Sequence, residues 1–493
     1  MTKIVLAGAD SHYDGSEGYP PLGLAYVASY LRKYAGISEI AIAEKDDDLL
    51  GSIVRQRPDI VGIGSTSVLF GSATNLAAQI KEKLDIPVIV GGPHVTCIPT
   101  TLPKAFDVGV VGEGERTMLE LIQAFEKDGG LKKESLRKIN GLTFFDGGKL
   151  TVTPKRELIE PLDSIPYPAR DLFLMEKHYM KPRRIISKVN LNRGTHMLSS
   201  RGCPFNCVFC ASSCFWRHKI RFFSPEYVIG EMKELIGKYN VEVIALFDDL
   251  FIANKDRLEK IVGLIKKEGI EKSIAFRCLA RADMTDEKTC QLLKDMNVHT
   301  VSVGFESGSE KMLKYLKRNT VTLEQNVRAA KLLKQYGFEI DGLFMLGSPY
   351  ETRVDMMKTL DFIKSSDIDT IELCFTTPFP GTDLWEYAKE RGLVSDDMDW
   401  SLLDLKSYAT DFNKMIFLND QMSKEEFLQV YEIFQKDVER RNLSINLKLK
   451  DLISFNMLKR AVAYPNLIPK FMYFAMMKKI KLAKENLKKQ AQG

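Results

Sequence analysis

The chain has few of the features that would place it in a membrane, outside the cell or on nucleic acid. It contains no run of about eighteen apolar residues, so no transmembrane helix is predicted. Its first residues enter a strand pattern directly and show no signal-peptide cleavage design. The net charge of +5 is small for 493 residues and gives no general argument for nucleic acid. Fixed-period repeats and low-complexity tracts are also absent, which leaves the composition of a soluble globular protein.

At this length the chain is expected to form about two to four domains. In residues 1–145, short apolar runs alternate with helical patterns. Strands are expected at 3–9, 59–64, 87–92 and 108–112, and helices at 22–34, 73–84 and 117–125. This order predicts an α/β, Rossmann-like domain with a parallel sheet. Glycines close the strand patterns, where doubly wound sheets bind ligands.

The remainder divides into three parts. Residues 146–194 are richer in proline and predict a linker with a small hairpin around Asp146. Residues 195–400 alternate strand and helix again, with strands expected at 195–200, 243–247, 274–278, 300–305, 340–345 and 370–375. Six such strands suit an open, partial (β/α)6 barrel with its site at the strand C-termini. Residues 401–493 are expected to form a mostly helical, basic domain.

The most informative motif is a set of three cysteines within eight residues, Cys203, Cys207 and Cys210. Three thiolates on one loop can hold three irons of a [4Fe-4S] cube and leave the fourth iron open. A partial zinc site and three ordinary core cysteines are the alternatives, although the other cysteines form no second pair at finger-like spacing. Cys214 would complete a four-thiolate set. Eight cysteines, three of them committed to a cluster, favour a reducing cytoplasm.

This C-x-x-x-C-x-x-C loop resembles the signature of the radical S-adenosylmethionine (SAM) superfamily. The resemblance implies that the open iron chelates the amino and carboxylate groups of SAM. One electron would then cleave the sulfonium and give a 5′-deoxyadenosyl radical. The position of the loop strengthens the resemblance, because it follows the apolar stretch expected to be the first barrel strand.

Polar residues follow the next two expected strands. Asp248 or Asp249 could accept hydrogen bonds from the SAM ammonium, a task that the family gives to an acidic residue here. Two helix-capping aspartates are the alternative. Arg277 and Arg281 flank the end of the third expected strand, and an arginine there could pair with the SAM carboxylate.

Later segments resemble the family's G-x-E-S-G, G-x-P-x-E-T and P-x-P-G-T motifs, at residues 304–308, 347–352 and 376–382. The resemblance makes Glu306 and Ser307 candidates for SAM contacts. Tyr350 stands where glycine is commoner in the second motif. Tyr350 and Arg281 are the candidates for orienting the substrate. Each motif is also a turn former, and the two roles are compatible.

A doubly wound domain in front of such a barrel resembles the cobalamin-binding subfamily. The residues that carry this resemblance are Pro20–Tyr26, Val90–His94 and Gly112–Glu115. The nucleotide tail of cobalamin needs a groove between sheet and helices that glycines let the backbone approach. The candidates for this contact are Ser65, Thr66, Gly91, Gly92, His94 and Gly112. An ordinary nucleotide-type fold is the alternative.

One loop contains a histidine that the subfamily pattern does not include. Residues 10–15 fit D-x-H-x-x-G, the loop by which cobalamin enzymes such as methionine synthase place histidine beneath cobalt. His12 is therefore a possible cobalt ligand, and Asp10 could orient its imidazole. A polar loop histidine near the corrin edge is the alternative, since the subfamily usually lacks a protein ligand on cobalt.

The resemblance implies a cobalamin-dependent radical SAM methyltransferase that moves a methyl group from SAM, through methylcobalamin, to an unactivated carbon. Oxidative cyclisation or rearrangement without methyl transfer is the alternative. A ferredoxin or flavodoxin is expected as electron donor. From Arg440 onward the chain carries thirteen basic and two acidic residues, which mildly favours a lipid, protein or peptide substrate and allows peripheral membrane contact. A solvated helix packed on its own domain is the alternative for this segment.

Overall fold

The computed structural model describes residues 2–9, 18–44, 48–180, 193–404 and 411–446, with side chains given only through Val438 in the last helix. Two compact units divide the chain, Met1–Phe434 and Gln435–Gly493. Both sheets below belong to the first unit. Most of the second unit, including the basic segment beyond residue 446, lies outside the described residues.

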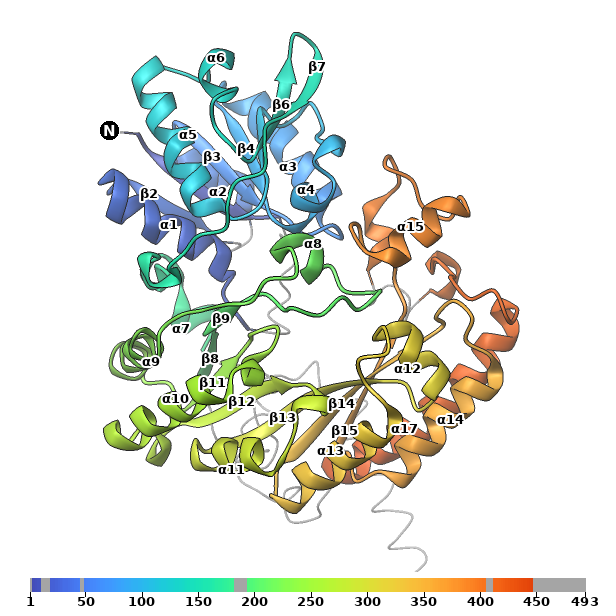
Figure 1. The fold of residues 1–493 in the computed structure, drawn as a ribbon. Helices are drawn as coiled ribbons and strands as arrows, with labels where there is room; N and C mark the ends of the chain where they lie inside the picture. Colours follow the sequence, from blue (N-terminus) through green and yellow to red (C-terminus); the bar gives the residue numbers. More distant parts are fainter. Residues whose placement is uncertain (1, 10–17, 45–47, 181–192, 405–410, 447–493) are drawn as a thin grey trace, which may run out of the picture. The chain divides into compact units, whose positions relative to one another are not determined.

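The N-terminal sheet has seven strands in the order β2-β1-β3-β4-β5-β6-β7, with the first five parallel (Figure 1). Its strands are β1 Ile4–Gly8, β2 Ile40–Ala43, β3 Ile60–Gly64, β4 Val88–Gly91, β5 Val108–Val110, β6 Leu142–Asp146 and β7 Lys149–Val152. Its helices are α1 Leu22–Ala35, α2 Leu49–Gln56, α3 Phe70–Lys83, α4 Pro93–Cys97, α5 Gly114–Asp128 and α6 Lys133–Leu136. The parallel strands are almost wholly buried, as expected for a sheet that helices cover. The predicted α/β, Rossmann-like fold is confirmed.

Two details of this sheet differ from the sequence prediction. The β2–α2 unit was not predicted, because its strand has only four residues and its helix only eight. The expected hairpin is present as β6 and β7, but β6 pairs antiparallel with β5. The hairpin therefore extends the N-terminal sheet rather than standing alone in the linker.

The second sheet has six parallel strands in the order β15-β14-β13-β12-β11-β8. They are β8 Gly194–Met197, β11 Val243–Leu246, β12 Ala275–Ala280, β13 Val298–Glu306, β14 Glu339–Leu346 and β15 Thr370–Phe375. Sequence order equals spatial order, and among the described strands β8 and β15 form the two edges, so the sheet is an open (β/α)6 barrel as predicted. The helices that follow its strands are α9 Pro225–Tyr239, α10 Lys255–Glu268, α11 Glu287–Asp295, α12 Glu310–Leu316, α13 Leu323–Gln335, α14 Arg353–Ser365 and α15 Asp383–Glu390.

Short elements complete the fold. The linker contains α7 Met175–His178, and the barrel carries the antiparallel pair β9 Ser200–Arg201 and β10 Arg221–Phe222, with α8 Ser212–Trp216 between them. The first barrel strand ends at Met197, three residues before its predicted end. Helix α17 Lys424–Asn446 follows the barrel and matches the helical content expected there. In the described ranges, no helix is both long enough and apolar enough to cross a bilayer.

Candidate functional site

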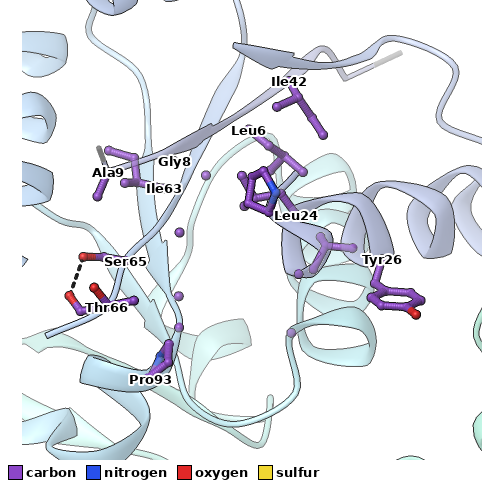
Figure 2. Close-up of a pocket in the computed structure, with 18 of the residues that line it drawn as sticks. Leu6, Gly8, Ala9, Leu24, Tyr26, Ile42, Ile63, Ser65, Thr66 and Pro93 are labelled. Carbon is purple, nitrogen blue, oxygen red and sulfur yellow. Dashed lines mark hydrogen bonds between the residues drawn. The ribbon is translucent and has the colours of Figure 1, made fainter. Parts of the chain in front are cut away.

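A cavity of about 530 Å³ lies at the C-terminal ends of the strands of the N-terminal sheet. Gly8 and Ala9 reach it from β1, and Gly64 reaches it from β3. The order in which strands are added to the sheet reverses between these two parallel strands, since β2 lies on the other side of β1. Such switch points are where doubly wound sheets bind ligands. Figure 2 shows the polar Ser65 and Thr66 on one side of the cavity, away from the apolar residues Leu24 and Ile42.

Five of the residues predicted to contact cobalamin line this cavity, namely Ser65, Thr66, Gly91, Gly92 and Gly112. Gly92 has a φ of 118°, and a Cβ at this position would overlap the backbone oxygen of Ser65. Only glycine fits there without strain, so the backbone stays open at the cavity wall. Small residues and exposed backbone groups suit the nucleotide tail that the sequence predicts for this groove.

His94 does not line the cavity. Its ring is fully buried, stacks on Phe70 at 3.7 Å and lies 3.2 Å from the Ser67 hydroxyl and 3.1 Å from the Thr101 hydroxyl. Burial lowers the pKa of His94 to about 3, which keeps the imidazole neutral. These contacts favour a structural role over a contact with cobalamin. His12, the possible cobalt ligand, lies outside the described residues.

Residues from the barrel side complete the cavity wall. Leu198, Arg201, Phe215 and Trp216 come from the segments that flank the cysteine loop, and His178 comes from the linker. The sequence prediction missed all of them, because nothing in their local pattern points to a groove formed by a distant part of the sequence. The cavity is thus shared by the N-terminal sheet and the base of the cysteine loop.

The cysteine loop joins β9 to α8 and carries Cys203, Cys207 and Cys210 as free, partly buried thiols. Burial raises the pKa of Cys203 and raises that of Cys210 to about 11, so these thiols need a bound metal to become thiolates. Among the described residues, no three His, Cys, Asp or Glu side chains are arranged to hold a single metal ion. In a cube, each of the three cysteines would bind a different iron.

Cys214 is engaged away from this loop. Its thiol is hydrogen-bonded to that of Cys97 in α4, and both side chains pack against Gly381. This contact argues against Cys214 as a fourth ligand. The three remaining loop cysteines thus fit a cluster with one open iron.

The two adjacent aspartates after β11 differ in their surroundings. Asp248 is fully buried and accepts hydrogen bonds from the Ser199 amide at 3.0 Å, the Ser199 hydroxyl at 2.8 Å and the Ser200 hydroxyl. Asp249 is exposed and accepts hydrogen bonds from the Ser212 hydroxyl, at 2.8 Å, and from the Gly202 amide, which lie at the two ends of the cysteine loop. Asp249 is therefore the better placed of the two for the SAM ammonium.

The two arginines predicted at the end of the third strand also differ in their surroundings. Strand β12 runs to Ala280, so Arg277 lies within it rather than at its end, and it is bonded to Asp341 at 2.9 Å and Ser302 at 3.0 Å. Arg281 follows the strand end. Its guanidinium lies 3.8 Å from the Cys207 sulfur and 3.5 Å from the centre of the Phe205 ring, both in the cysteine loop. Arg281 is thus the arginine beside the predicted cluster.

Glu306 and Ser307 occupy the end of β13. Glu306 has a left-handed φ of 61° and forms a buried ion pair at 2.8 Å with Lys317, which lies 5.6 Å from the Phe209 ring of the cysteine loop. Ser307 is fully buried and bonded to Thr359 at 2.9 Å, which favours a structural role. Lys317 was missed in the sequence, since a lone lysine after α12 carries no motif.

Tyr350 lies in the turn after β14 with a φ of 63°, a conformation that explains why glycine is commoner at this position. Its side chain is 41% exposed and meets the rings of Tyr315 and Tyr387 edge-on, at 5.3 and 5.9 Å. In the same turn, Glu351 accepts bonds from the amides of Gly347 and Ser348 at 2.7 and 3.1 Å. The turn is therefore built by its own residues and leaves the tyrosine ring at the surface.

Comparisons with known proteins agree with this architecture. Residues 197–363 match the family model of the radical SAM superfamily, and residues 16–122 match that of the B12 binding domain. A protein of Pyrococcus horikoshii named uncharacterized methyltransferase PH0819 is 37% identical over 390 residues, which are 77% of this chain and 81% of the relative. An anaerobic magnesium-protoporphyrin IX monomethyl ester cyclase of Rubrivivax gelatinosus is 29% identical, over 89% of this chain and 80% of the relative.

Among solved structures, the radical SAM methyltransferase TsrM of Kitasatospora setae, with cobalamin and a [4Fe-4S] cluster bound, superposes with a TM-score of 0.64. The two chains are 19% identical over 80% of this chain and 76% of that chain, so the likeness concerns the fold. The fold and both family models define a radical SAM enzyme with a cobalamin-binding domain. The chain belongs to the cobalamin-dependent radical SAM methyltransferase family, and its cofactors are a [4Fe-4S] cluster, SAM and cobalamin.

Proposed function

We propose that this enzyme transfers a methyl group from SAM, by way of cobalamin, to an unactivated carbon of a lipid, protein or peptide. The observation that supports it most is the shared cavity, whose walls include both the strand ends of the N-terminal sheet and residues that flank the cysteine loop. A carbon without acidity cannot be deprotonated by a side chain, so the bound cofactors supply the radical and the methyl group.

The protein's own residues would bind and orient these groups. Cys203, Cys207 and Cys210 would each bind one iron. Arg281, 3.8 Å from the Cys207 sulfur, would pair with the SAM carboxylate, and Asp249 would accept hydrogen bonds from its ammonium group.

Tyr350 is the proposed substrate-orienting residue. The Glu306–Lys317 pair would fix the end of β13 close to the loop.

Relatives that methylate different compounds frame the substrate proposal. They include a hopanoid C-2 methylase of Rhodopseudomonas palustris and a bacteriochlorophyllide d C-12(1)-methyltransferase of Chlorobaculum tepidum, each 24% identical to this chain. We place the enzyme in the cytoplasm, with a ferredoxin or flavodoxin as electron donor. Its basic C-terminal sequence would allow peripheral contact with an anionic membrane.

Anaerobic reconstitution followed by mass comparison of cell extracts, treated with and without the enzyme, tests this function. Methyl transfer predicts a product heavier by one methyl group, formed together with S-adenosylhomocysteine and 5′-deoxyadenosine. Formation of the methylated product and of S-adenosylhomocysteine that is unaffected by removing cobalamin would contradict the proposal.

Oxidative cyclisation without methyl transfer is the second candidate, because the similarity to the cyclase of Rubrivivax gelatinosus extends over 465 residues. In that case 5′-deoxyadenosine would form without S-adenosylhomocysteine. The product would also lose hydrogen instead of gaining a methyl group.

A further inference from the structure

Four buried charged side chains connect the cavity wall to the base of the cysteine loop. Arg201 donates hydrogen bonds to Glu113 and to Glu115, each at 2.6 Å. Arg221 donates to both carboxylate oxygens of Glu113, at 2.9 and 3.1 Å. No side chain of this set is more than 5% exposed. We call Arg201, Arg221, Glu113 and Glu115 the arginine–glutamate bridge.

The two halves of the bridge come from the two parts that hold the candidate sites. Both glutamates belong to the Gly112–Glu115 segment, and every residue of that segment lines the cavity. Arg201 pairs with Arg221 across the β9–β10 ladder, and only Gly202 separates it from Cys203. Gly202 has a φ of 94°, and a Cβ there would overlap the backbone oxygen of Lys219. Because this turn is constrained, the position of Arg201 helps to set the position of Cys203.

Aromatic rings and the linker restrict the bridge further. The Arg201 guanidinium lies 4.9 Å from the Tyr26 ring of α1 and 5.9 Å from the Trp216 ring of α8. Glu113 accepts a bond from the Ile159 amide at 2.7 Å, and Arg221 donates to the Ile159 carbonyl at 2.7 Å. The charged groups therefore have one favourable arrangement.

Burial alone would raise the pKa of Glu113, but Arg201 and Arg221 hold it below its ordinary value, so Glu113 is charged in the folded protein. Buried ion pairs add little net stability compared with apolar residues of the same volume, and their best-attested use is to select one arrangement of the parts they join.

We propose that Arg201 and Glu115 are positioning residues that hold the cysteine loop at one fixed distance from the cobalamin cavity. This inference rests on the proposed function, because a reaction that uses both cofactors on one substrate needs a fixed separation between them. Loss of either residue would spread that separation over a range while Cys203, Cys207 and Cys210 all remain in place.

The distance between the two centres is the direct test. Full-length protein reconstituted with the cluster and cobalamin, and reduced to the paramagnetic cluster and cob(II)alamin, is measured by pulsed dipolar electron paramagnetic resonance without added substrate. The wild type should give one narrow distribution. Arg201→Lys keeps the charge but loses the two-pronged hydrogen bond, and Glu115→Gln keeps the size but loses the charge. Both variants should broaden the distribution.

Arg32→Lys is the matched control. The Arg32–Asp171 ion pair, at 2.8 Å, likewise joins two separate segments, in this case α1 and the linker, but its side chains are partly exposed. Its distribution should equal that of the wild type. In the two bridge variants, methylation of cobalamin by SAM should fall on the order of 100-fold, since about 1 Å of misplacement costs that much. Formation of 5′-deoxyadenosine from SAM should stay at the wild-type rate.

Narrow, wild-type distributions in both bridge variants would overturn the inference. So would a parallel loss of both reactions together with lost iron or cobalamin, because it would assign the bridge to folding alone. A wild type that never methylates cobalamin would refute the proposed function instead, while the distance distributions would still decide whether the bridge fixes the separation.

Discussion

The cavity of the N-terminal sheet and the barrel mouth at the cysteine loop are built from different kinds of residue. Glycine, alanine and aliphatic side chains dominate the cavity, as at Gly8, Ala9 and Leu24. Charged side chains in ion pairs surround the cysteine loop, as in Arg281–Asp283 and Lys317–Glu306. A groove of small residues selects a large rigid ligand by shape, whereas charged side chains orient a small charged one. Substitutions should therefore act through volume in the first region and through charge and metal ligation in the second.

The largest effect should come from the loop itself. Cys207→Ala removes one proposed iron ligand, so the protein should lose the cluster and all SAM cleavage. Cobalamin binding should persist, because Cys207 is not among the residues that line the cavity. Iron analysis, absorbance of bound cobalamin and 5′-deoxyadenosine formation measure the three properties on one sample.

Cys214→Ala is the control for this variant, since the Cys214 thiol is bonded to Cys97 and not to the loop. It should keep the iron content of the wild type. Loss of iron in the Cys214 variant would instead support the four-thiolate alternative.

Gly92→Ala tests the cavity of the N-terminal sheet, where substitutions should act through volume. A Cβ at this position would overlap the Ser65 carbonyl oxygen, and the left-handed backbone adds strain. The free energy of unfolding should fall on the order of 3 kcal/mol, and cobalamin affinity should fall with it. Chemical denaturation and absorbance titration give the two values.

Gly71→Ala makes the same chemical change in α3, where the new methyl group meets nothing within 4 Å. It should change the free energy of unfolding by less than about 1 kcal/mol, in the stabilising direction. Equal losses in the two alanine variants would show that the cavity wall does not depend on close backbone approach at Gly92.

The fold was predictable to a larger extent than the site. Long, mostly buried strands such as β13 and β14 are rich in apolar residues, and the six-strand order of the barrel follows from the number and spacing of such segments. Strand β2 was missed because four residues, Ile40–Ala43, give too short a pattern between charged neighbours. The pairing of β6 with β5 depends on contacts that no local pattern encodes.

Asp248 and Asp249 offer a sharper test of the barrel mouth, where substitutions should act through charge. Asp248→Asn should lower the free energy of unfolding by about 1–3 kcal/mol, because its buried oxygens accept several hydrogen bonds that an amide nitrogen would oppose. Asp249→Asn should leave stability unchanged and weaken SAM binding roughly tenfold, since a hydrogen bond to a charged group contributes about 1.5 kcal/mol or more.

Thermal denaturation and equilibrium dialysis with SAM separate these two effects. The opposite result, with SAM binding lost only in the Asp248 variant, would assign the ammonium contact to the buried carboxylate. That outcome would also mean that the Ser199 and Ser200 bonds are released when SAM binds.

Which residues share a site was the least predictable property. The sequence indicated Asp248 and Asp249 equally, and only the three-dimensional contacts with Ser199 and Ser212 distinguish them. Motif residues such as Gly92 and Cys207 could be proposed from the sequence because the chemistry of the ligand fixes their spacing. Arg201 and Lys317 were not found, because a charged residue gains its role from a partner distant in sequence.

Acid should destabilise the protein through its buried histidines at a higher pH than through the bridge glutamate. Burial lowers the pKa of His94, in the N-terminal region, from 6.5 to about 3, and its ring contacts Ser67, Thr101, Phe70 and Trp400. Its contribution to stability is complete above about pH 6.5 and is lost as the pH falls toward 3, because the unfolded chain binds the proton first. The free energy of unfolding should therefore fall by up to about 1.4 kcal/mol per pH unit for this group.

The bridge glutamate behaves differently in the same interval. The lowered pKa of Glu113 places its loss of stability below the ordinary carboxyl range, so it contributes no slope between roughly pH 6 and pH 5. His196, whose pKa burial lowers to about 3, should add a second slope like that of His94. Chemical denaturation across this interval should show a shallower slope in His94→Gln than in the wild type. Identical slopes would mean that the His94 imidazole becomes protonated in the folded protein as readily as in the unfolded chain. The buried surroundings of its ring would then have to accommodate a charge.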